Sequence, residues 1–148
     1  MDSKYLIVGS SHAALEAAAA IRMIDSRGSL TLLTRDAHLP YSPTILPYVV
    51  SGRSQPDNVL LRDAAYFRDN AIALVSGASV SAVDPAQSSL RLASGECWQY
   101  DRLLIATGAA PSLPPVAGLA EVPYHVLRSM DDALGLKQAM QQAKAGLE

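Results

Sequence analysis

The feature that most constrains the fold is an apolar strand that runs into a small-residue turn and an alanine-rich helix, YLIVGSSHAA at residues 5–14. This order matches the G-x-G-x-x-G/A turn with which dinucleotide-binding folds hold a pyrophosphate. Gly9 fills the first position, Ser11 replaces the second glycine, and Ala14 fills the third in its permitted alanine form. Serine is small and can donate a hydrogen bond to phosphate. The turn alone leaves two interpretations open, a nucleotide site and an ordinary connection.

The rest of the chain alternates between strand and helix patterns and then becomes antiparallel. Strands are expected at residues 4–8, 30–34, 72–75, 102–106 and 124–127, and helices at 11–27, 60–70 and 130–144, with a short helix in the Pro-rich loop that ends at Gly52. Gly28 is expected to end the first helix, and Ser129 to cap the last one. Alternating runs at 80–83, 90–92 and 98–100 predict a meander. The predicted fold is α/β, a Rossmann-like domain over residues 1–148 with a central parallel sheet and an antiparallel three-stranded β-meander.

Composition excludes several classes of partner. The chain has 148 residues, a net charge of -2 and no long run of one charge, so neither nucleic acid nor a membrane is expected as a partner. The single Cys97 cannot form an internal disulfide, and we expect it to be a small apolar filler on a strand in a cytoplasmic protein. The three histidines are not spaced as metal ligands, so no metal is expected.

Four motifs occur in an order that resembles one family. They are IVGSSHAALEAA, LTLLTRDAHLPYSPTILPYVVSGR, YDRLLIATGAAP and VLRSMDDA. Together they resemble the start of the flavoprotein pyridine nucleotide-disulfide oxidoreductases, over nearly the whole chain. The resemblance is strongest to the branch without a redox disulfide, which includes rubredoxin, ferredoxin and nitrite reductase flavoproteins, and ATGAAP matches the second FAD signature of the family. PYSPTILPYVVSG also resembles the flavin-bearing subunit of a multisubunit enzyme that passes electrons to NAD.

The resemblance implies FAD as cofactor and places its contacts at several points along the chain. The implied contacts are Gly9, Ser10, Ser11, His12 and Ala13 at the pyrophosphate, Val80 at the adenine, Ala106, Thr107 and Gly108 at the later turn, and Arg128 from a strand before the last helix. Helix N-termini favour such an anion through their amide donors and dipole.

Three positions depart from the family pattern. Where the family has an acid for the adenosine ribose, this chain has Arg35, which could instead meet a 2′-phosphate as in NADP sites; Asp36 could reach the ribose after a one-residue shift, and we favour Asp36. The loop that often supplies a cation to the flavin has Pro43 and Tyr48 instead, and Tyr48 could stack there. Thr44 stands where one thiol branch has its cysteine, so disulfide substrates are not expected.

These residues predict the FAD-binding part of an NAD(P)H-linked flavoprotein oxidoreductase. The full-length enzyme would pass electrons between nicotinamide and a protein or small acceptor, without a redox-active disulfide, while NAD(P) binds in a domain outside this chain. The chain alone is expected to be inactive. Its partners would be a redox protein or other subunits of a complex, with a homo-oligomer also open. The alternative is a non-catalytic module that holds NADP through Arg35, or a scaffold that has lost its cofactor.

Overall fold

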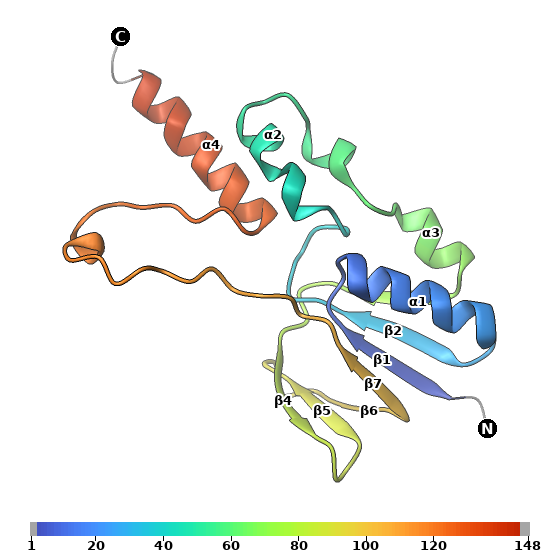
Figure 1. Ribbon diagram of the computed structural model, residues 1–148. Helices are drawn as coiled ribbons and strands as arrows, with labels where there is room; N and C mark the ends of the chain where they lie inside the picture. The colour runs from blue at the N-terminus through green and yellow to red at the C-terminus, as the bar shows by residue number, and fades with distance from the viewer. Residues whose placement is uncertain (1–2, 146–148) are drawn as a thin grey trace. The chain divides into compact units, whose positions relative to one another are not determined.

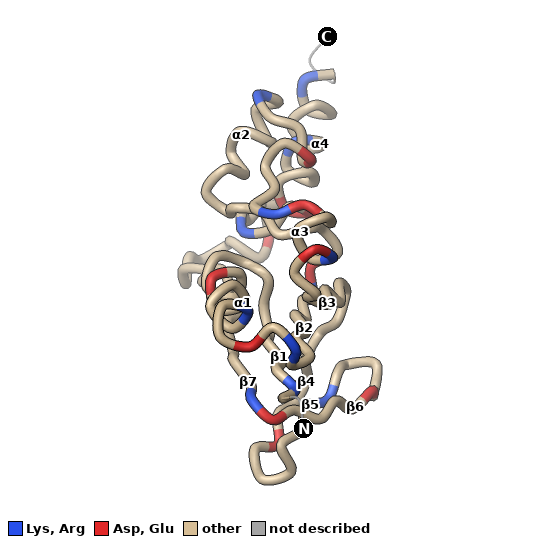
Figure 2. The backbone as a smooth tube through the Cα atoms, turned by 90° about the vertical axis from the view of Figure 1, so that its right-hand side faces the viewer, with Lys and Arg blue, Asp and Glu red and all other residues tan. Residues whose placement is uncertain are grey.

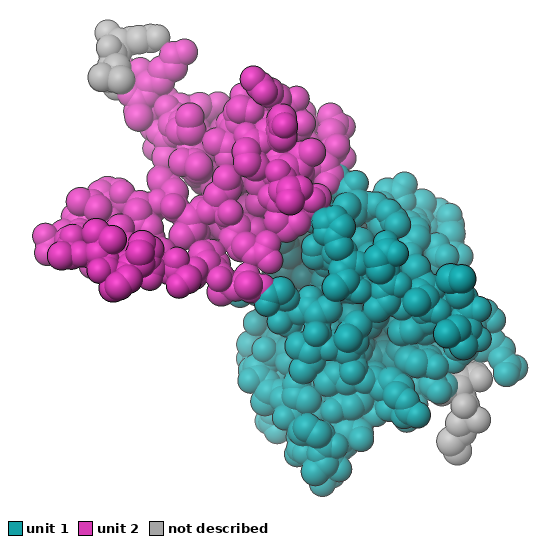
Figure 3. All heavy atoms as spheres, viewed as in Figure 1, with its two compact units in different colours: residues 1–41, 60–108 teal, residues 42–59, 109–148 magenta. Residues whose placement is uncertain are grey.

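The computed structural model describes residues 3–145 of the chain. These residues divide into two compact units, the first built from residues up to 41 and from 60–108, and the second from residues 42–59 and from 109 onwards (Figure 3). Figure 2 shows basic and acidic residues interspersed along the backbone of each unit. Within the described residues, no helix has the length and apolar character needed to cross a membrane.

The first unit is organised around a four-stranded parallel sheet. Its strands are β1 (Lys4–Val8), β2 (Ser29–Leu33), β3 (Ile72–Val75) and β7 (Arg102–Ile105), in the order β3-β2-β1-β7. Because parallel strands are covered on both faces, they form from nearly continuous apolar runs such as LTLL in β2. The predicted central parallel sheet is confirmed.

Two helices contribute to the core on one face of this sheet. The helix α1 (His12–Ile24) buries Ala14, Leu15 and Ala18, and the short α3 (Ala64–Asp69) buries Phe67 in the same cluster. Ile7 of β1 points to this face, because successive strand side chains alternate. The small alanine side chains let α1 lie close to the strands (Figure 1).

The antiparallel meander contributes to the core on the opposite face. It consists of β4 (Val80–Asp84), β5 (Ser89–Leu92) and β6 (Cys97–Gln99), paired in that order. Leu90 and Leu92 of β5 form a cluster with Leu6 and Val8 of β1. The predicted antiparallel meander is confirmed, and the sheet carries helices α1 and α3 on one face and the meander on the other (Figure 1).

The second unit consists of short helices and connecting segments. Its elements are the 3-10 turns η1 (Pro43–Ile45), η2 (Pro56–Val59) and η3 (Leu119–Glu121), and the helices α2 (Leu46–Val50) and α4 (Met130–Ala145). Helix α2 lies against α4, and both bury apolar residues, among them Leu46, Val49 and Met130. The proline at the start of α2 is tolerated because the first helical turn needs no N–H donor there.

Two predicted helices extend too far. The first ends at Ile24 rather than near Gly28, because Asp25 Oδ1 accepts the N–H groups of Arg27 at 2.9 Å and Gly28 at 2.8 Å and so turns the chain out of the helix. The helix expected at 60–70 begins only after Asp63, whose carboxylate caps the N–H of Tyr66 at 2.9 Å. The start of that segment is extended instead, since Leu60 pairs with Tyr41 in a β-bridge.

Two further expectations are wrong. Residues 124–127 form no strand, because the structure gives that segment no ladder partner among the described residues. Cys97 is exposed on β6, where its Sγ lies 3.8 Å from the carbonyl of Gly95, and is not a buried filler. β6 has only three residues, and the face that packs on the sheet is occupied by Trp98.

Candidate nucleotide-binding site

Gly9 forms the tight turn that follows β1. Its φ of +125° is rarely adopted by residues with a side chain, and a Cβ there would collide with the carbonyl oxygen of Ala106. The turn is fixed by two backbone bonds, from Gly9 N to Leu33 O and from Ala106 N to Val8 O, both 2.8 Å. Glycine is therefore required here by both conformation and space.

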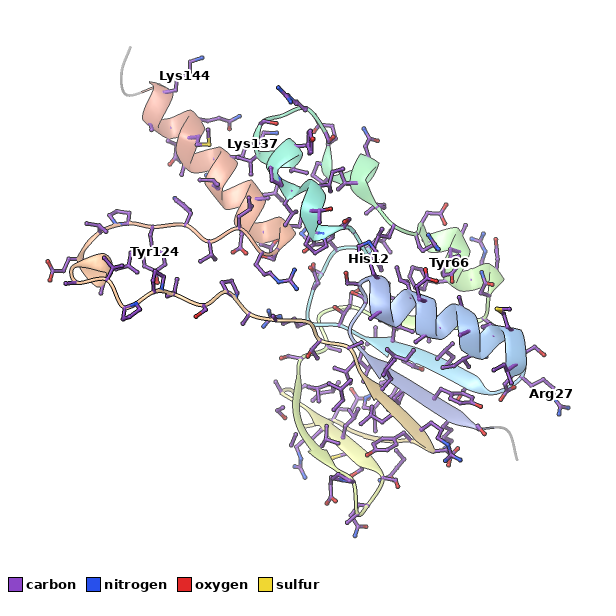
Figure 4. All side chains as sticks on the ribbon, in the orientation of Figure 1. His12, Arg27, Tyr66, Tyr124, Lys137 and Lys144 are labelled. Atoms are coloured by element: carbon purple, nitrogen blue, oxygen red, sulfur yellow. The ribbon has the colours of Figure 1, made fainter. Side chains whose placement is uncertain are left out.

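The N-terminus of α1 follows this turn without a cap of its own. The side chain of Ser11 makes no capping hydrogen bond, and the first turn contains no acidic residue. The first intrahelical bond runs from Leu15 N to Ser11 O at 3.0 Å, so the N–H groups of His12 and Ala13 precede the helical ladder. His12 stands at this end of the helix (Figure 4). These donors and the helix dipole fit an anionic group such as a pyrophosphate.

The two departures from the glycine fingerprint are compatible with this geometry. Ser11 has φ of -89°, an ordinary value, so a side chain there causes no backbone strain. Ala14 has 0% of its surface exposed, which explains why the third position needs a residue as small as alanine.

Ser10 connects the turn to the end of β2. Its hydroxyl donates to Oγ1 of Thr34 at 3.1 Å, and the same oxygen accepts the N–H of Asp36 at 3.2 Å. Thr34 has only 7% of its surface exposed. The sequence offered Thr34 only as one of three candidates for the ribose contact, beside Arg35 and Asp36; the signal for this bond is a polar residue at the end of an apolar strand.

The two candidate ribose contacts after β2 differ in their surroundings. The side chain of Arg35 is exposed. The carboxylate of Asp36 accepts from the hydroxyl of Tyr41 at 2.6 Å and from the N–H of His38 at 3.0 Å. The sequence reasoning also missed this role of Tyr41.

The later turn lies at the same edge of the sheet as Gly9. It follows β7, which pairs in parallel with β1, and Gly108 adopts φ of +69°. Ala106 packs against the α1-side cluster, whereas Thr107 is exposed. The structure thus brings residues 9–13, 34–36 and 106–108 to the carboxyl ends of neighbouring strands, where parallel sheets bind ligands. Val80 begins β4 and packs into the meander-side cluster.

The other two predicted contacts belong to the second unit. Tyr48 lies on α2 with 46% of its surface exposed. Arg128 donates from Nε to the carbonyl oxygen of Ala109 at 2.8 Å. Thr44 lies in η1, and its hydroxyl is 2.8 Å from that of Ser42. Contact of Tyr48 or Arg128 with FAD stays a prediction.

A small hollow of about 220 Å³ lies next to the end of β3. It is lined by small and apolar residues: Val75, Ser76, Gly77, Ala78, Ser79, Leu92, Ala93 and Ser94. None of the predicted contacts lines it, so it is separate from the Gly9 turn. Among the described side chains, no three His, Cys, Asp or Glu residues are grouped as metal ligands would be.

The chain is similar over nearly its whole length to known oxidoreductases. The chain is 53% identical over 142 residues to the NADH-dependent phenylglyoxylate dehydrogenase subunit epsilon of Aromatoleum evansii, covering 96% of this chain and 34% of that protein. It is 32% identical over 139 residues to the biphenyl dioxygenase system ferredoxin--NAD(+) reductase component of Paraburkholderia xenovorans, covering 94% and 34%. The crystal structure of NADH:rubredoxin oxidoreductase from Clostridium acetobutylicum superposes with a TM-score of 0.81 at 25% identity, covering 96% of this chain and 36% of that one.

The chain spans about a third of the length of the curated relatives that it matches. Residues 3–146 match the family described as pyridine nucleotide-disulphide oxidoreductase. That match includes the Gly9 turn, the end of β2 and the turn after β7. The chain therefore belongs to the pyridine nucleotide-disulphide oxidoreductase family.

Proposed function

We propose that this chain is the FAD-binding portion of an NAD(P)H-linked flavoprotein oxidoreductase. The observation that carries the proposal is the N-terminus of α1, which follows a turn where position 9 accepts only glycine. This helix end has neither a side-chain cap nor an acid in its first turn. Proteins of this family bind FAD and use NAD(P)H as substrate. When bound, FAD supplies hydride and electron transfer between the nicotinamide and an acceptor.

The residues of the chain bind and orient the cofactor. The backbone from Gly9 to Ala13 would hold the pyrophosphate, with Gly9 allowing the chain to turn and the amides of α1 donating to phosphate oxygens. The turn at Gly108 would let the backbone approach the cofactor without a side chain in between. We assign no proton transfer to any side chain of this chain.

We infer that the electron path contains no redox-active disulfide within this chain. Thr44 stands at the position where one thiol branch of the family has its cysteine. Cys97 lies on β6 of the meander, and the sequence contains no second cysteine with which it could pair. A full-length protein with Cys97→Ser should therefore transfer electrons from NADH within about twofold of the wild-type rate, as a surface substitution would.

The partners that we propose are other subunits of a multisubunit dehydrogenase. The supporting fact is the identity to an NADH-dependent dehydrogenase subunit, 53%, against 32% to a ferredoxin reductase component. Because the chain covers a third of these relatives, the activity belongs to the longer protein. Native mass spectrometry of the full-length protein, purified under non-denaturing conditions from the cells that naturally produce it, should give a hetero-oligomer. A protein that remains alone yet reduces a free ferredoxin would contradict this assignment.

The cofactor assignment is tested on the purified full-length protein by its visible absorption and its flavin content after heat release. We expect one FAD per chain and bleaching of the flavin absorption by NADH under anaerobic conditions. A protein without flavin, with no spectral change on addition of FAD, would contradict the proposal. Tight binding of a 2′-phosphorylated nucleotide with no binding of FAD would instead support the NADP module.

A further inference from the structure

The end of β2 presents a free cation where dinucleotide folds commonly present an acid. An acid at this position accepts hydrogen bonds from the ribose hydroxyls. Arg35 is exposed at this position, and a guanidinium has five donors and no acceptor. The chemistry that Arg35 can recognise is therefore an acceptor-rich group rather than a diol acting as donor.

Asp36 is engaged within its own loop. One carboxylate oxygen accepts from the hydroxyl of Tyr41 at 2.6 Å, and the other accepts from the N–H of His38 at 3.0 Å. Tyr41 has only 7% of its surface exposed, so the bond anchors the loop to the core. Both carboxylate oxygens thus hold the loop that follows β2, which gives Asp36 a positioning role in the loop.

The backbone on both sides of Arg35 is fixed by the loop after β3. Thr34 N donates to Val75 O at 3.0 Å, Ala78 N donates to Thr34 O at 2.7 Å, and Gly77 N donates to Asp36 O at 3.2 Å. The hydroxyls of Ser10 and Thr34 connect the same stretch to the Gly9 turn. Arg35 is thus an exposed side chain on a hydrogen-bonded stretch of backbone, at the sheet edge that carries the N-terminus of α1.

We propose that Arg35 binds a phosphate group of the nucleotide held at this edge, and that Asp36 positions the loop instead of binding the ribose. This inference rests on the proposed function of the Gly9 turn. The planar guanidinium matches two phosphate oxygens at once, which makes such contacts strong and directional. Two sources offer that phosphate, the pyrophosphate of FAD and a 2′-phosphate on an adenosine.

The test measures dissociation constants of FAD, ADP and 2′,5′-ADP by calorimetry on the full-length protein after removal of its flavin. The variants are Arg35→Ala and Arg35→Lys, with Arg27→Ala as the matched control. Arg27 is also exposed, and it lies near the other end of α1 from His12 (Figure 4). Loss of a charge-assisted bidentate contact predicts at least about a tenfold weakening in Arg35→Ala, partial recovery in Arg35→Lys and no change in Arg27→Ala.

The pattern of losses identifies the phosphate. Weakening of FAD and ADP together assigns the contact to the pyrophosphate, whereas weakening of 2′,5′-ADP alone assigns it to the 2′-phosphate. The dependence of affinity on salt should also fall in Arg35→Ala, because one phosphate contact has been removed. If Arg35→Ala stays within about twofold of Arg27→Ala for all three ligands, a difference too small for a charge-assisted contact, the proposal is wrong.

Asp36→Asn provides the second measurement. We expect it to lower the melting temperature while its affinity for ADP stays within about threefold of wild type, since a positioning residue acts through the loop. A larger loss of ADP binding in Asp36→Asn than in Arg35→Ala would show that Asp36 binds the ribose and would overturn the inference. If the wild type binds ADP or 2′,5′-ADP but no FAD, the proposed FAD-binding function is wrong, and the Arg35 proposal is tested with these two nucleotides. A wild type that binds none of the three ligands refutes both the proposed function and the Arg35 proposal.

Discussion

Helices α1 and α4 both begin directly after a serine, but only the serine before α4 caps its helix through its side chain. Ser129 accepts the N–H of Asp132 at 3.2 Å, and the carboxylate of Asp132 accepts the N–H of Ser129 at 2.8 Å in return. This is the reciprocal capping box, with an aspartate in the role of the usual glutamate. Ser11 makes no capping bond, and α1 has no acid in its first turn, whereas α4 has Asp131 and Asp132.

The contrast distinguishes a helix N-terminus that is capped by its own residues, in α4, from one whose donors suit a ligand, in α1. At α4 the chain supplies its own acceptors and negative charge, so the donors and the dipole are compensated internally. At α1 the glycine turn brings the helix to the end of a buried strand, and the first N–H donors have neither a side-chain cap nor an acid in the first turn. Four substitutions test this contrast, beginning with the one expected to have the largest effect.

Gly9→Ala should be the most damaging change. The added Cβ meets the carbonyl oxygen of Ala106 and takes a φ of +125°, so overpacking and backbone strain add to a destabilisation of about 3 kcal/mol or more, with loss of FAD. Gly52→Ala is the matched control, since Gly52 has φ of +77° with nothing near its Cβ position. That control should cost about 1 kcal/mol from conformation alone.

Urea unfolding and flavin content of the full-length protein measure both changes. Equal destabilisation by the two substitutions would show that the collision with Ala106 is relieved by local movement. The close approach of β1 and β7 at Gly9 would then not be essential to the site.

Ala13→Glu should have opposite effects on helix stability and cofactor binding. Ala13 is exposed in the first turn of α1, so a glutamate there supplies the missing negative charge and stabilises the helix by about 0.5 kcal/mol. The same charge would repel a pyrophosphate and compete for the amides, weakening FAD about tenfold or more. Ala20→Glu, also exposed but two turns further along, should leave FAD binding unchanged.

Fluorescence titration of FAD and thermal unfolding of the flavin-free protein report the two effects separately. If Ala13→Glu and Ala20→Glu bind FAD equally, the N-terminus of α1 is not where the pyrophosphate lies. The comparison with α4 would then describe only a difference in capping.

Asp132→Ala should act on stability alone. It removes the acceptor for the N–H groups of Ser129 and of Arg128, at 2.8 and 3.0 Å, and should cost about 1–2 kcal/mol. Because the capping bonds are reciprocal, Ser129→Ala combined with Asp132→Ala should cost less than the sum of the single changes. A double-mutant cycle by urea unfolding measures this coupling, and full additivity would contradict a shared cap.

The elements were predictable wherever the pattern was local. The strands around Ile7 and Leu32 and the meander around Leu90 follow from runs of apolar residues and turn residues. The cap at Ser129 follows from a serine three residues before an aspartate. The helix ends were not predictable in the same way, because Asp25 accepts two backbone N–H groups and Asp63 accepts one, and these partners are chosen only when the chain folds.

The candidate site was predictable in outline and not in its details. Gly9 and Gly108 are recognisable because only glycine suits their backbone, and both lie at the expected turns. Which of Arg35 and Asp36 has an engaged side chain depends on Tyr41, whose contact with Asp36 joins residues five apart in a loop and has no periodic signal. The exposure of Cys97 likewise depends on which face of a three-residue strand packs on the sheet.

The smallest effect is expected at the other end of α1, from the pH dependence of Asp25. The N–H groups of Gly28 and then Arg27 hold the pKa of this carboxyl below its usual value of 3.8, with smaller help from the hydroxyl of Tyr5 and the charge of Arg22, against a contribution from desolvation. A lowered pKa in the folded state means that the ionised carboxylate stabilises the fold above the unfolded pKa. That contribution is lost as the pH falls through the folded pKa.

Asp25→Asn removes this titration while keeping an oxygen that can accept from the same N–H groups. The melting temperature of the wild type should exceed that of the variant near neutral pH, and the difference should narrow once the pH falls below about 4. Thermal unfolding of both full-length proteins across that range measures the narrowing. A difference in melting temperature that stays constant from neutral to acid pH would show that Asp25 ends α1 by the geometry of its hydrogen bonds alone. Negative charge would then stabilise the N-terminus of α4 but play no part at the C-terminus of α1.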